Sequence, residues 1–187
     1  MKKLIIGISG ADGVCLAVRL LHHLQKLDDV ETHLVMTASA ERNLLIEGEV
    51  TPDEVKKLAD YAYDIDDMAA TISSGSFKTD GMLIVPCSMK TLAAITCGYT
   101  DNLVQRAADV CLKENRKVVL VPREMPLGRV HLRNLLTANE LGCVIVPPVL
   151  TFYNKPESIE DHMDHILGKA LMQFDIELPS FKSWKGV

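Results

Sequence analysis

The sequence lacks the features that mark a secreted or membrane-bound protein. Its five cysteines contain no CxxC pair and no tight spacing, which argues against a disulfide framework or a zinc site. The longest uncharged stretch, residues 142–154, holds two prolines and is shorter than the ~20 residues that cross a bilayer. Asp12 interrupts the first apolar run too early for a secretion leader. We therefore expect a cytoplasmic protein without a membrane segment.

The chain also lacks an excess of basic charge. Its 20 Lys and Arg residues stand against 25 Asp and Glu residues, with a net charge of −5 and no basic block, so nucleic acid is not an expected partner. What the chain does have is apolar: 48% of its 187 residues are hydrophobic, enough to build a core without metals or disulfides. No linker, repeat or low-complexity segment divides it, which predicts a single domain over residues 1–187.

Short apolar runs alternate with longer amphipathic segments. The pattern predicts strands at residues 3–9, 32–36, 82–85, 117–121 and 144–146, and helices at residues 14–25, 38–46, 52–61, 89–96, 102–114, 130–141 and 158–174. Residues 51–54, Thr-Pro-Asp-Glu, form a capping box at one helix start. The last two strands are almost continuously hydrophobic, as in a parallel sheet buried on both faces. The expected fold class is α/β: a doubly wound, mostly parallel, Rossmann-like or flavodoxin-like sheet with helices on both faces.

Such sheets bind ligands beyond the carboxyl ends of their strands, so the residues that follow each strand are informative. After the first strand, a glycine-rich turn at residues 7–13 opens a helix whose free N–H groups suit a phosphate. Its spacing is GxxGxxG instead of GxGxxG, and Thr37 and Ser39 follow the second strand where an acidic residue would hold a ribose. A nicotinamide dinucleotide is therefore not expected. The alternative interpretation is a tight turn without a ligand.

Three further loops carry informative residues. Residues 86–91, Pro-Cys-Ser-Met-Lys-Thr, open a second helix, where Ser88 either caps the helix or binds phosphate. Cys87 has no histidine near it in the sequence, which favours a structural thiol over a nucleophile. Arg123 and Glu124 lie between two prolines, which stiffen their loop. The loop at residues 147–154 is apolar and aromatic, and suits a flat ring or a hydrocarbon.

Other groups have two interpretations each. Arg106, Asp109 and Lys113 share one face of the predicted helix 102–114, either as a salt-bridged surface stripe or as part of a site. Residues 73–77, Ser-Ser-Gly-Ser-Phe, form either a flexible loop or a ligand clamp. His162 and His165 imitate a metal pair, but no third ligand is evident, so a metal site is the less favoured interpretation.

In order and spacing, these strings resemble the motifs of the UbiX flavin prenyltransferases. The resemblance rests on residues 7–13, 73–77, 86–91, 106–110, 122–127 and 152–153, and it extends from Met1 to about Gly186. It is closest to the members that are known as components of hydroxyarylic (phenolic) acid decarboxylases. It implies a metal-independent transfer of a dimethylallyl group from dimethylallyl monophosphate to N5 and C6 of reduced FMN, whose product passes to a UbiD-type decarboxylase. It also implies a homododecamer with active sites at subunit contacts, in which the helix and tail at residues 158–187 contact neighbouring subunits.

The resemblance assigns roles residue by residue. The positions that match FMN contacts are Gly10, Ala11, Asp12, Thr37, Ser88, Met89, Lys90, Thr91 and Arg123. The positions that match the binding of the dimethylallyl phosphate are Tyr153 and Lys169, and those that match other residues lining the reaction site are Glu47, Ser74, Arg106, Lys113 and Glu124. Cations placed there would stabilise charge on a departing phosphate. Glu47 or Glu124 would serve as the proton relay.

Two positions depart from the family's usual pattern. Asp12 replaces a serine, and Lys169 replaces an arginine, which keeps the charge but loses the planar fork. Because a carboxylate is repelled by a nearby phosphate, we expect Asp12 to cap the first helix and to leave flavin contacts to the backbone. Two alternative functions stay open: a flavin-dependent cysteine decarboxylase, whose PxSANT-like string and early-helix histidine are not clear here, and a carrier that binds FMN without catalysis.

Overall fold

A single parallel sheet organises the molecule. The computed structural model describes residues 1–48, 50–184 and 186. Six strands lie in the order β3-β2-β1-β4-β5-β6, and every neighbouring pair is parallel. They are β1 (Lys2–Ile8), β2 (Val30–Met36), β3 (Tyr61–Tyr63), β4 (Gly81–Cys87), β5 (Lys117–Pro122) and β6 (Val144–Ile145). The predicted doubly wound α/β fold is confirmed.

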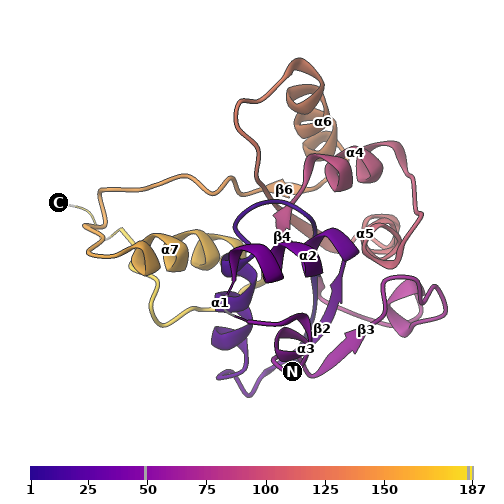
Figure 1. Ribbon diagram of the computed structural model, residues 1–187, viewed down its shortest axis with the longest axis horizontal. Coiled ribbons are helices and arrows are strands. Elements are labelled where there is room, and N and C mark those ends of the chain that lie inside the picture. The colour runs from indigo at the N-terminus through magenta and orange to yellow at the C-terminus, as the bar shows by residue number, and fades with distance from the viewer. Residues whose placement is uncertain (49, 185, 187) are drawn as a thin grey trace.

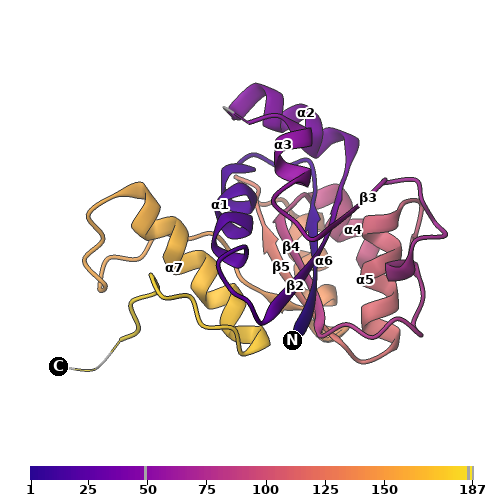
Figure 2. The same cartoon turned by 90° about the horizontal axis from the view of Figure 1, so that it is seen from below.

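Helices cover both faces of this sheet. Figure 2 shows α1 (Cys15–Leu24) and α7 (Ile159–Leu171) on one face, and α4 (Met89–Cys97) and α5 (Leu103–Lys113) on the other. Residues of α2 (Ala38–Glu47) and α3 (Pro52–Lys56) join the core of the α1 face, and α6 (Arg129–Glu140) joins that of the α5 face. Two short 3₁₀ turns, η1 (Thr71–Ser73) and η2 (Met172–Phe174), complete the described elements.

Strand β1 lies at the centre of the sheet and separates two apolar cores. Leu4 and Ile6 pack with α1 and α7, whereas Ile5 packs with α5. Each of these side chains is at most 1% exposed. Because both faces of the strand are covered, its sequence is continuously hydrophobic instead of alternating.

The strand order places a topological switch between β1 and β4. From β1 the chain proceeds through β2 and β3 to one edge, and from β4 it proceeds through β5 and β6 to the other. The loops after β1 and β4 therefore lead to opposite sides and leave a crevice between them. Hydrogen bonds hold the two loops together: the Ser88 N–H donates to Ser9 Oγ at 2.8 Å, and the Ser9 N–H donates to the Pro86 carbonyl at 3.2 Å.

One predicted boundary is wrong. The helix expected over residues 52–61 ends at Lys56, and Tyr61–Tyr63 form the edge strand β3. The cause lies in Asp60, whose Oδ2 accepts hydrogen bonds from the N–H and the hydroxyl of Thr32, both at 2.8 Å. This side chain draws the segment alongside β2 before the helix can continue.

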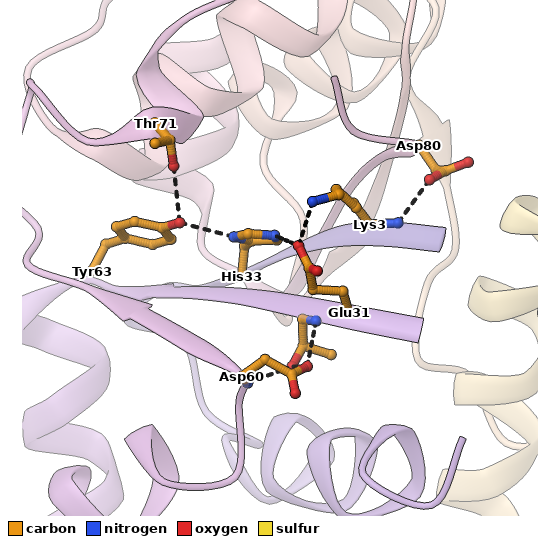
Figure 3. Close-up of polar contacts among 8 residues, drawn as sticks. Lys3, Glu31, His33, Asp60, Tyr63, Thr71 and Asp80 are labelled. Atoms are coloured by element: carbon orange, nitrogen blue, oxygen red, sulfur yellow. Dashed lines mark hydrogen bonds and ion pairs between the residues drawn. The ribbon is translucent and has the colours of Figure 1, made fainter. Parts of the chain in front are cut away.

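A network of hydrogen-bonded polar side chains joins strand β3 to the rest of the sheet (Figure 3). His33 on β2 is 2% exposed and lies between Glu31 Oε1, 2.8 Å from its Nε2, and the Tyr63 hydroxyl, 2.9 Å from its Nδ1. Lys3 of β1 donates to the same Glu31 oxygen at 2.7 Å, and the Tyr63 hydroxyl lies 3.0 Å from that of Thr71 in η1. Burial lowers the pKa of the His33 imidazole. The network joins three strands and η1, so we interpret it as structural.

The segment between β6 and α7 extends away from the sheet as an arm (Figure 1). It is largely apolar, and Phe152 on it is 72% exposed. Among the described residues, no helix combines the length and apolar character needed to span a membrane.

Candidate active site

A polar cavity lies at the carboxyl ends of the central strands. It measures about 450 Å³ and draws its walls from the loops after β1, β2, β3, β4 and β5 and from the start of α5. It is lined by Gly10, Thr37, Ala38, Ser39, Ile65, Asp66, Ser88, Lys90, Thr91, Asp101, Asn102, Gln105 and Glu124. The cavity brings together most of the predicted flavin-contacting residues.

The start of α4 forms one wall of this polar cavity. Ser88 Oγ accepts a hydrogen bond from the Thr91 N–H at 3.2 Å and lies 3.1 Å from the Thr91 hydroxyl. Ser88 thus caps α4, which is one of the two roles that the sequence leaves open for it. The hydroxyls of both residues and the exposed Lys90 line the cavity beside a helix N-terminus, an arrangement whose polarity favours an anion.

The part of the wall formed by the turns after β1 and β2 needs a glycine. A Cβ on Gly10 would lie 2.3 Å from the Cβ of Ser39, so only glycine lets the turns after β1 and β2 approach so closely. Thr37 caps α2 by accepting a hydrogen bond from the Ala40 N–H at 3.2 Å. Ala11 is buried and Met89 packs against the core, so neither side chain lines the cavity.

The capping role predicted for Asp12 is wrong. The carboxylate at the start of α1 is that of Glu47, which accepts hydrogen bonds from the N–H groups of Gly13 at 2.9 Å and Val14 at 3.4 Å. Asp12 instead pairs with Arg123 in the loop after β5, with 2.6 Å between Oδ2 and Nη2. Gly13, at φ +92°, turns the chain between Asp12 and the helix, and the end of α2 brings Glu47 to the place that the sequence suggested for Asp12.

An apolar cavity adjoins the polar one. It measures about 650 Å³, and its lining is Pro122, Arg123, Glu124, Met125, Pro126, Leu127, Leu135, Ile145, Pro147, Pro148 and Val149. Glu124 borders both cavities. Arg123 stands at the same junction, because it follows the buried strand β5 and reaches back to the turn after β1.

Tyr153 and Lys169 line a third cavity, of about 350 Å³, between β6, the arm and α7. The Tyr153 hydroxyl lies 3.2 Å from Nε2 of His165, and the Lys169 ammonium lies 5.7 Å from the ring centroid of Phe181. This cavity shares Ile145, Pro147 and Val149 with the apolar cavity. The two residues predicted to bind the prenyl donor are therefore together, but in a cavity that does not include the predicted flavin contacts.

A buried ion pair fixes α7 against α1. The Asp164 carboxylate, 6% exposed, accepts two hydrogen bonds from Arg19, at 2.5 and 2.9 Å, and lies 2.8 Å from Nε2 of His23. Although burial raises the pKa of Asp164, these partners outweigh it and hold the pKa at about 2. The pair positions the helix that carries Lys169.

Ser74, Arg106 and Lys113 form a separate group along α5. Arg106 donates from Nε to the Ser73 carbonyl at 3.1 Å and from Nη1 to Asp109 at 2.9 Å, while Lys113 pairs with Glu114 at 2.6 Å. Ser74 Oγ lies 2.8 Å from Ser76 Oγ. None of the three lines the cavities described above. The predicted ion-paired stripe on α5 is present between Arg106 and Asp109.

The sequence also raised a cysteine nucleophile and a histidine metal site, and neither finds support in the described part of the chain. Cys87 is fully buried, and burial strongly raises the pKa of its thiol, which suits a structural residue. His165 contacts Tyr153 and Asn154 and stacks on Phe181. No group of three or more His, Cys, Asp or Glu residues in the described segments is arranged to hold a metal ion.

Several cavity-lining residues were not predicted from the sequence: Asp66, Asp101, Asn102 and Gln105. Gln105 is 3% exposed and accepts a hydrogen bond from the Asp101 N–H at 2.8 Å, which shapes the loop before α5. Asn102 could have indicated this part of the cavity, because asparagine is typical of a helix N-cap and α5 begins at the edge of the sheet where the strands end. In the structure its Oδ1 does accept a hydrogen bond from the Gln105 N–H.

Comparison with known proteins agrees with this geometry. Residues 1–171 match the family model described as Flavoprotein. A probable UbiX-like flavin prenyltransferase from Sedimentibacter hydroxybenzoicus is 56% identical over 184 residues, which cover 98% of this chain and 97% of that protein.

Two solved structures are also similar. A dodecameric FMN-dependent UbiX-like decarboxylase from Escherichia coli O157:H7 has a TM-score of 0.96 at 51% identity, covering 98% of this chain and all (100%) of that one. AnUbiX (PadA1), solved in complex with FMN and dimethylallyl pyrophosphate, has a TM-score of 0.96 at 49% identity, covering 100% of this chain and 98% of that one. The chain belongs to the UbiX-like flavin prenyltransferases, within the Flavoprotein family.

Proposed function

We propose that this protein is a flavin prenyltransferase that transfers a dimethylallyl group from dimethylallyl monophosphate to reduced FMN. The observation that carries the proposal is the junction at Glu124, where a cavity lined by hydroxyls and a lysine meets one lined by apolar side chains. The first suits a phosphorylated, hydroxyl-rich cofactor and the second suits a short hydrocarbon. The reaction needs both at one place.

The residues of the polar cavity fit FMN chemically. Lys90, Ser88 and Thr91 at the start of α4 suit its phosphate, and the carboxylates of Asp66 and Asp101 suit its hydroxyl donors. When bound in reduced form, FMN supplies the electron-rich ring atoms that accept the prenyl group.

The protein's own groups account for the remaining chemistry. The apolar cavity shields the allyl group from water. The Arg123 guanidinium at its margin offsets the charge that accumulates on a departing phosphate. Glu124 borders both cavities, and its Oε1 accepts the Met125 N–H at 3.0 Å, which leaves Oε2 to take a proton at their junction. Glu47 lines neither cavity, and its carboxylate caps the start of α1. We therefore assign the proton relay to Glu124.

We further propose that the complete site forms between copies of the chain in a homododecamer. Tyr153 with Lys169, and Ser74 with Arg106 and Lys113, lie apart from the polar cavity of their own chain. The similar Escherichia coli structure is dodecameric. The helix and tail over residues 158–187 would contact neighbouring subunits; residues 185 and 187 of this segment lie outside the described residues. Neighbouring copies would supply the missing cations.

The prenylated FMN would pass to a UbiD-type decarboxylase in the cytoplasm. All five cysteines are free thiols, two of them exposed, which suits a reducing compartment.

Anaerobic incubation of the purified protein with reduced FMN and dimethylallyl monophosphate tests the function. We expect the extracted flavin to gain the mass of one dimethylallyl group. An unchanged flavin would indicate a carrier. In a parallel incubation with oxidised FMN and a peptide with a carboxy-terminal cysteine, release of carbon dioxide would indicate a decarboxylase.

A further inference from the structure

The ion pair between Asp12 and Arg123 joins the loops after β1 and β5 in the active site. Neither α1 nor β5 depends on this pair. Asp12 is not needed at the start of α1, because Glu47 occupies that position. Arg123 follows β5, whose register is already fixed by pairing with β4 and β6. The pair therefore has no evident task in holding the fold.

The location of the pair suggests another task. Arg123 lines the apolar cavity, and its neighbour Glu124 borders the polar cavity as well. Within the described residues, Asp12 is the acidic side chain in ion-pair contact with this guanidinium. Its carboxylate is thus paired with a cation that lines the apolar cavity next to Glu124, at the junction of the two cavities.

The pair is also easily opened. The side chains of Arg123 and Asp12 are 40% and 58% exposed, so solvent reaches both charged groups. Exposed pairs of this kind contribute little to stability. A phosphate with two negative charges offers Arg123 a stronger, bidentate partner.

We propose that Asp12 is a resident counter-ion of Arg123, which a phosphate monoester must displace when it binds at the junction of the two cavities. Asp12 is then a positioning residue: it holds the guanidinium in place before the ligand arrives and lowers the affinity for phosphate by competing for it. This inference rests on the proposed function, because both FMN and the prenyl donor are phosphate monoesters.

Equilibrium binding to the whole protein tests the inference without relying on turnover. FMN and riboflavin, which differ by the phosphate, are titrated by flavin fluorescence, and dimethylallyl monophosphate is titrated by calorimetry. We expect Asp12→Asn and Asp12→Ser to bind one of the two phosphate ligands about two- to fivefold more tightly and riboflavin unchanged. The ligand whose affinity rises is the one that uses Arg123. Asp12→Glu, which restores the carboxylate, should return toward the wild-type affinity.

Two controls separate exchange from general charge effects. Asp175→Asn removes the same charge from an exposed position beside Lys2, at the opposite end of β1, and should change neither affinity. In an Arg123→Gln background, Asp12→Asn should have no effect, because the shared cation is absent.

If Asp12→Asn tightens phosphate binding equally in the wild-type and Arg123→Gln backgrounds, the effect is simple repulsion between Asp12 and the phosphate, and the inference is overturned. Unchanged or weaker phosphate binding by the Asp12 variants would also overturn it. If wild-type protein fails to bind FMN at all, the proposed function fails instead.

Discussion

The Glu47 carboxylate, at the end of α2, accepts a hydrogen bond from the backbone N–H of Gly13 at 2.9 Å. A residue of α2 thereby caps the amino-terminal end of α1. Val14, the residue at the cap position of α1, contributes no side-chain hydrogen bond of its own. The start of α1 and the end of α2 are thereby tied together beside the polar cavity.

Removing this carboxylate should therefore destabilise the protein. We expect Glu47→Ala to lower the free energy of unfolding by about 0.5–1 kcal/mol, as for the loss of a helix cap, and Glu47→Gln to lose less. Urea unfolding at one protein concentration measures both. Glu41→Ala, which removes another α2 carboxylate from an exposed pair with Lys56, is the matched control and should cost less. Equal stabilities of Glu47→Ala and the wild type would contradict the capping role.

Acid should weaken the fold through His33. Because burial lowers the pKa of His33 in the folded state, the unfolded chain takes up this proton first as the pH falls below about 6.5. The contribution is thus intact above that pH and declines below it, by at most about 1.4 kcal/mol per pH unit. The free energy of unfolding is measured at about pH 7.5 and about pH 5.5, roughly one unit on either side of that value. Its dependence on pH should flatten in His33→Gln but not in the exposed His22→Gln. Identical slopes in wild type and His33→Gln would rule this out.

The buried pair between Arg19 and Asp164 should be costly to break. We expect Asp164→Ala to lose about 2–3 kcal/mol, because it leaves a half-buried guanidinium without its partner. Since the folded pKa of Asp164 is about 2, its contribution is present above about pH 4 and disappears as the pH falls toward 2. His23→Ala, which removes one of the weaker partners, should cost less. A loss in Asp164→Ala no larger than in His23→Ala would show that Arg19 does not carry the interaction.

Because Tyr153 and Lys169 line a cavity apart from the predicted flavin contacts, their substitution should affect the prenyl donor more than FMN. We expect Tyr153→Phe and Lys169→Ala to raise the KM for dimethylallyl monophosphate about tenfold, the effect of losing roughly 1.4 kcal/mol of phosphate binding, with little change in the affinity for FMN. Steady-state kinetics and flavin fluorescence measure the two effects. A matching loss of FMN affinity would assign these residues to the wrong ligand.

A site shared between copies predicts complementation. Lys113→Ala and Lys169→Ala lie in separate groups of one chain, so their co-expression should produce mixed assemblies that regain part of the activity lost by each variant alone. Lys113→Ala with Arg106→Ala, two changes on the same helix, should regain none. Absence of recovery in the first pair would contradict the supply of these two lysines to one site by different copies.

The fold was predictable because its signals are local. Continuous apolar runs mark the central strands, and the capping box at Thr51 and Glu54 marks the start of α3 as expected. Strand β3 was missed because its three residues, Tyr61–Tyr63, are exposed or half-buried and carry no apolar run. Contacts with β2, which is distant in the sequence, define it: the parallel pairing of the strands, the hydrogen bonds between Asp60 and Thr32, and the one between Tyr63 and His33.

The sequence indicated the types of residue in the site but not which of them lie together. The glycine turn and the start of α4 meet as expected, since both follow central strands. Asp12 was assigned to the wrong partner because Glu47, from α2, caps the start of α1, and Arg123, from the loop after β5, pairs with Asp12. The spacing of residues along the chain also gives no sign that Lys169 and Lys113 lie apart from the polar cavity.

The most direct test of prenyl transfer is the mass of the flavin extracted after anaerobic reaction with dimethylallyl monophosphate, unlabelled in one sample and fully deuterated in the other. The account predicts a product heavier than FMN by one dimethylallyl group, whose mass rises further by the deuterium of that single group, and a much lower yield from Glu124→Gln. Recovery of unmodified FMN from both wild-type samples would contradict it.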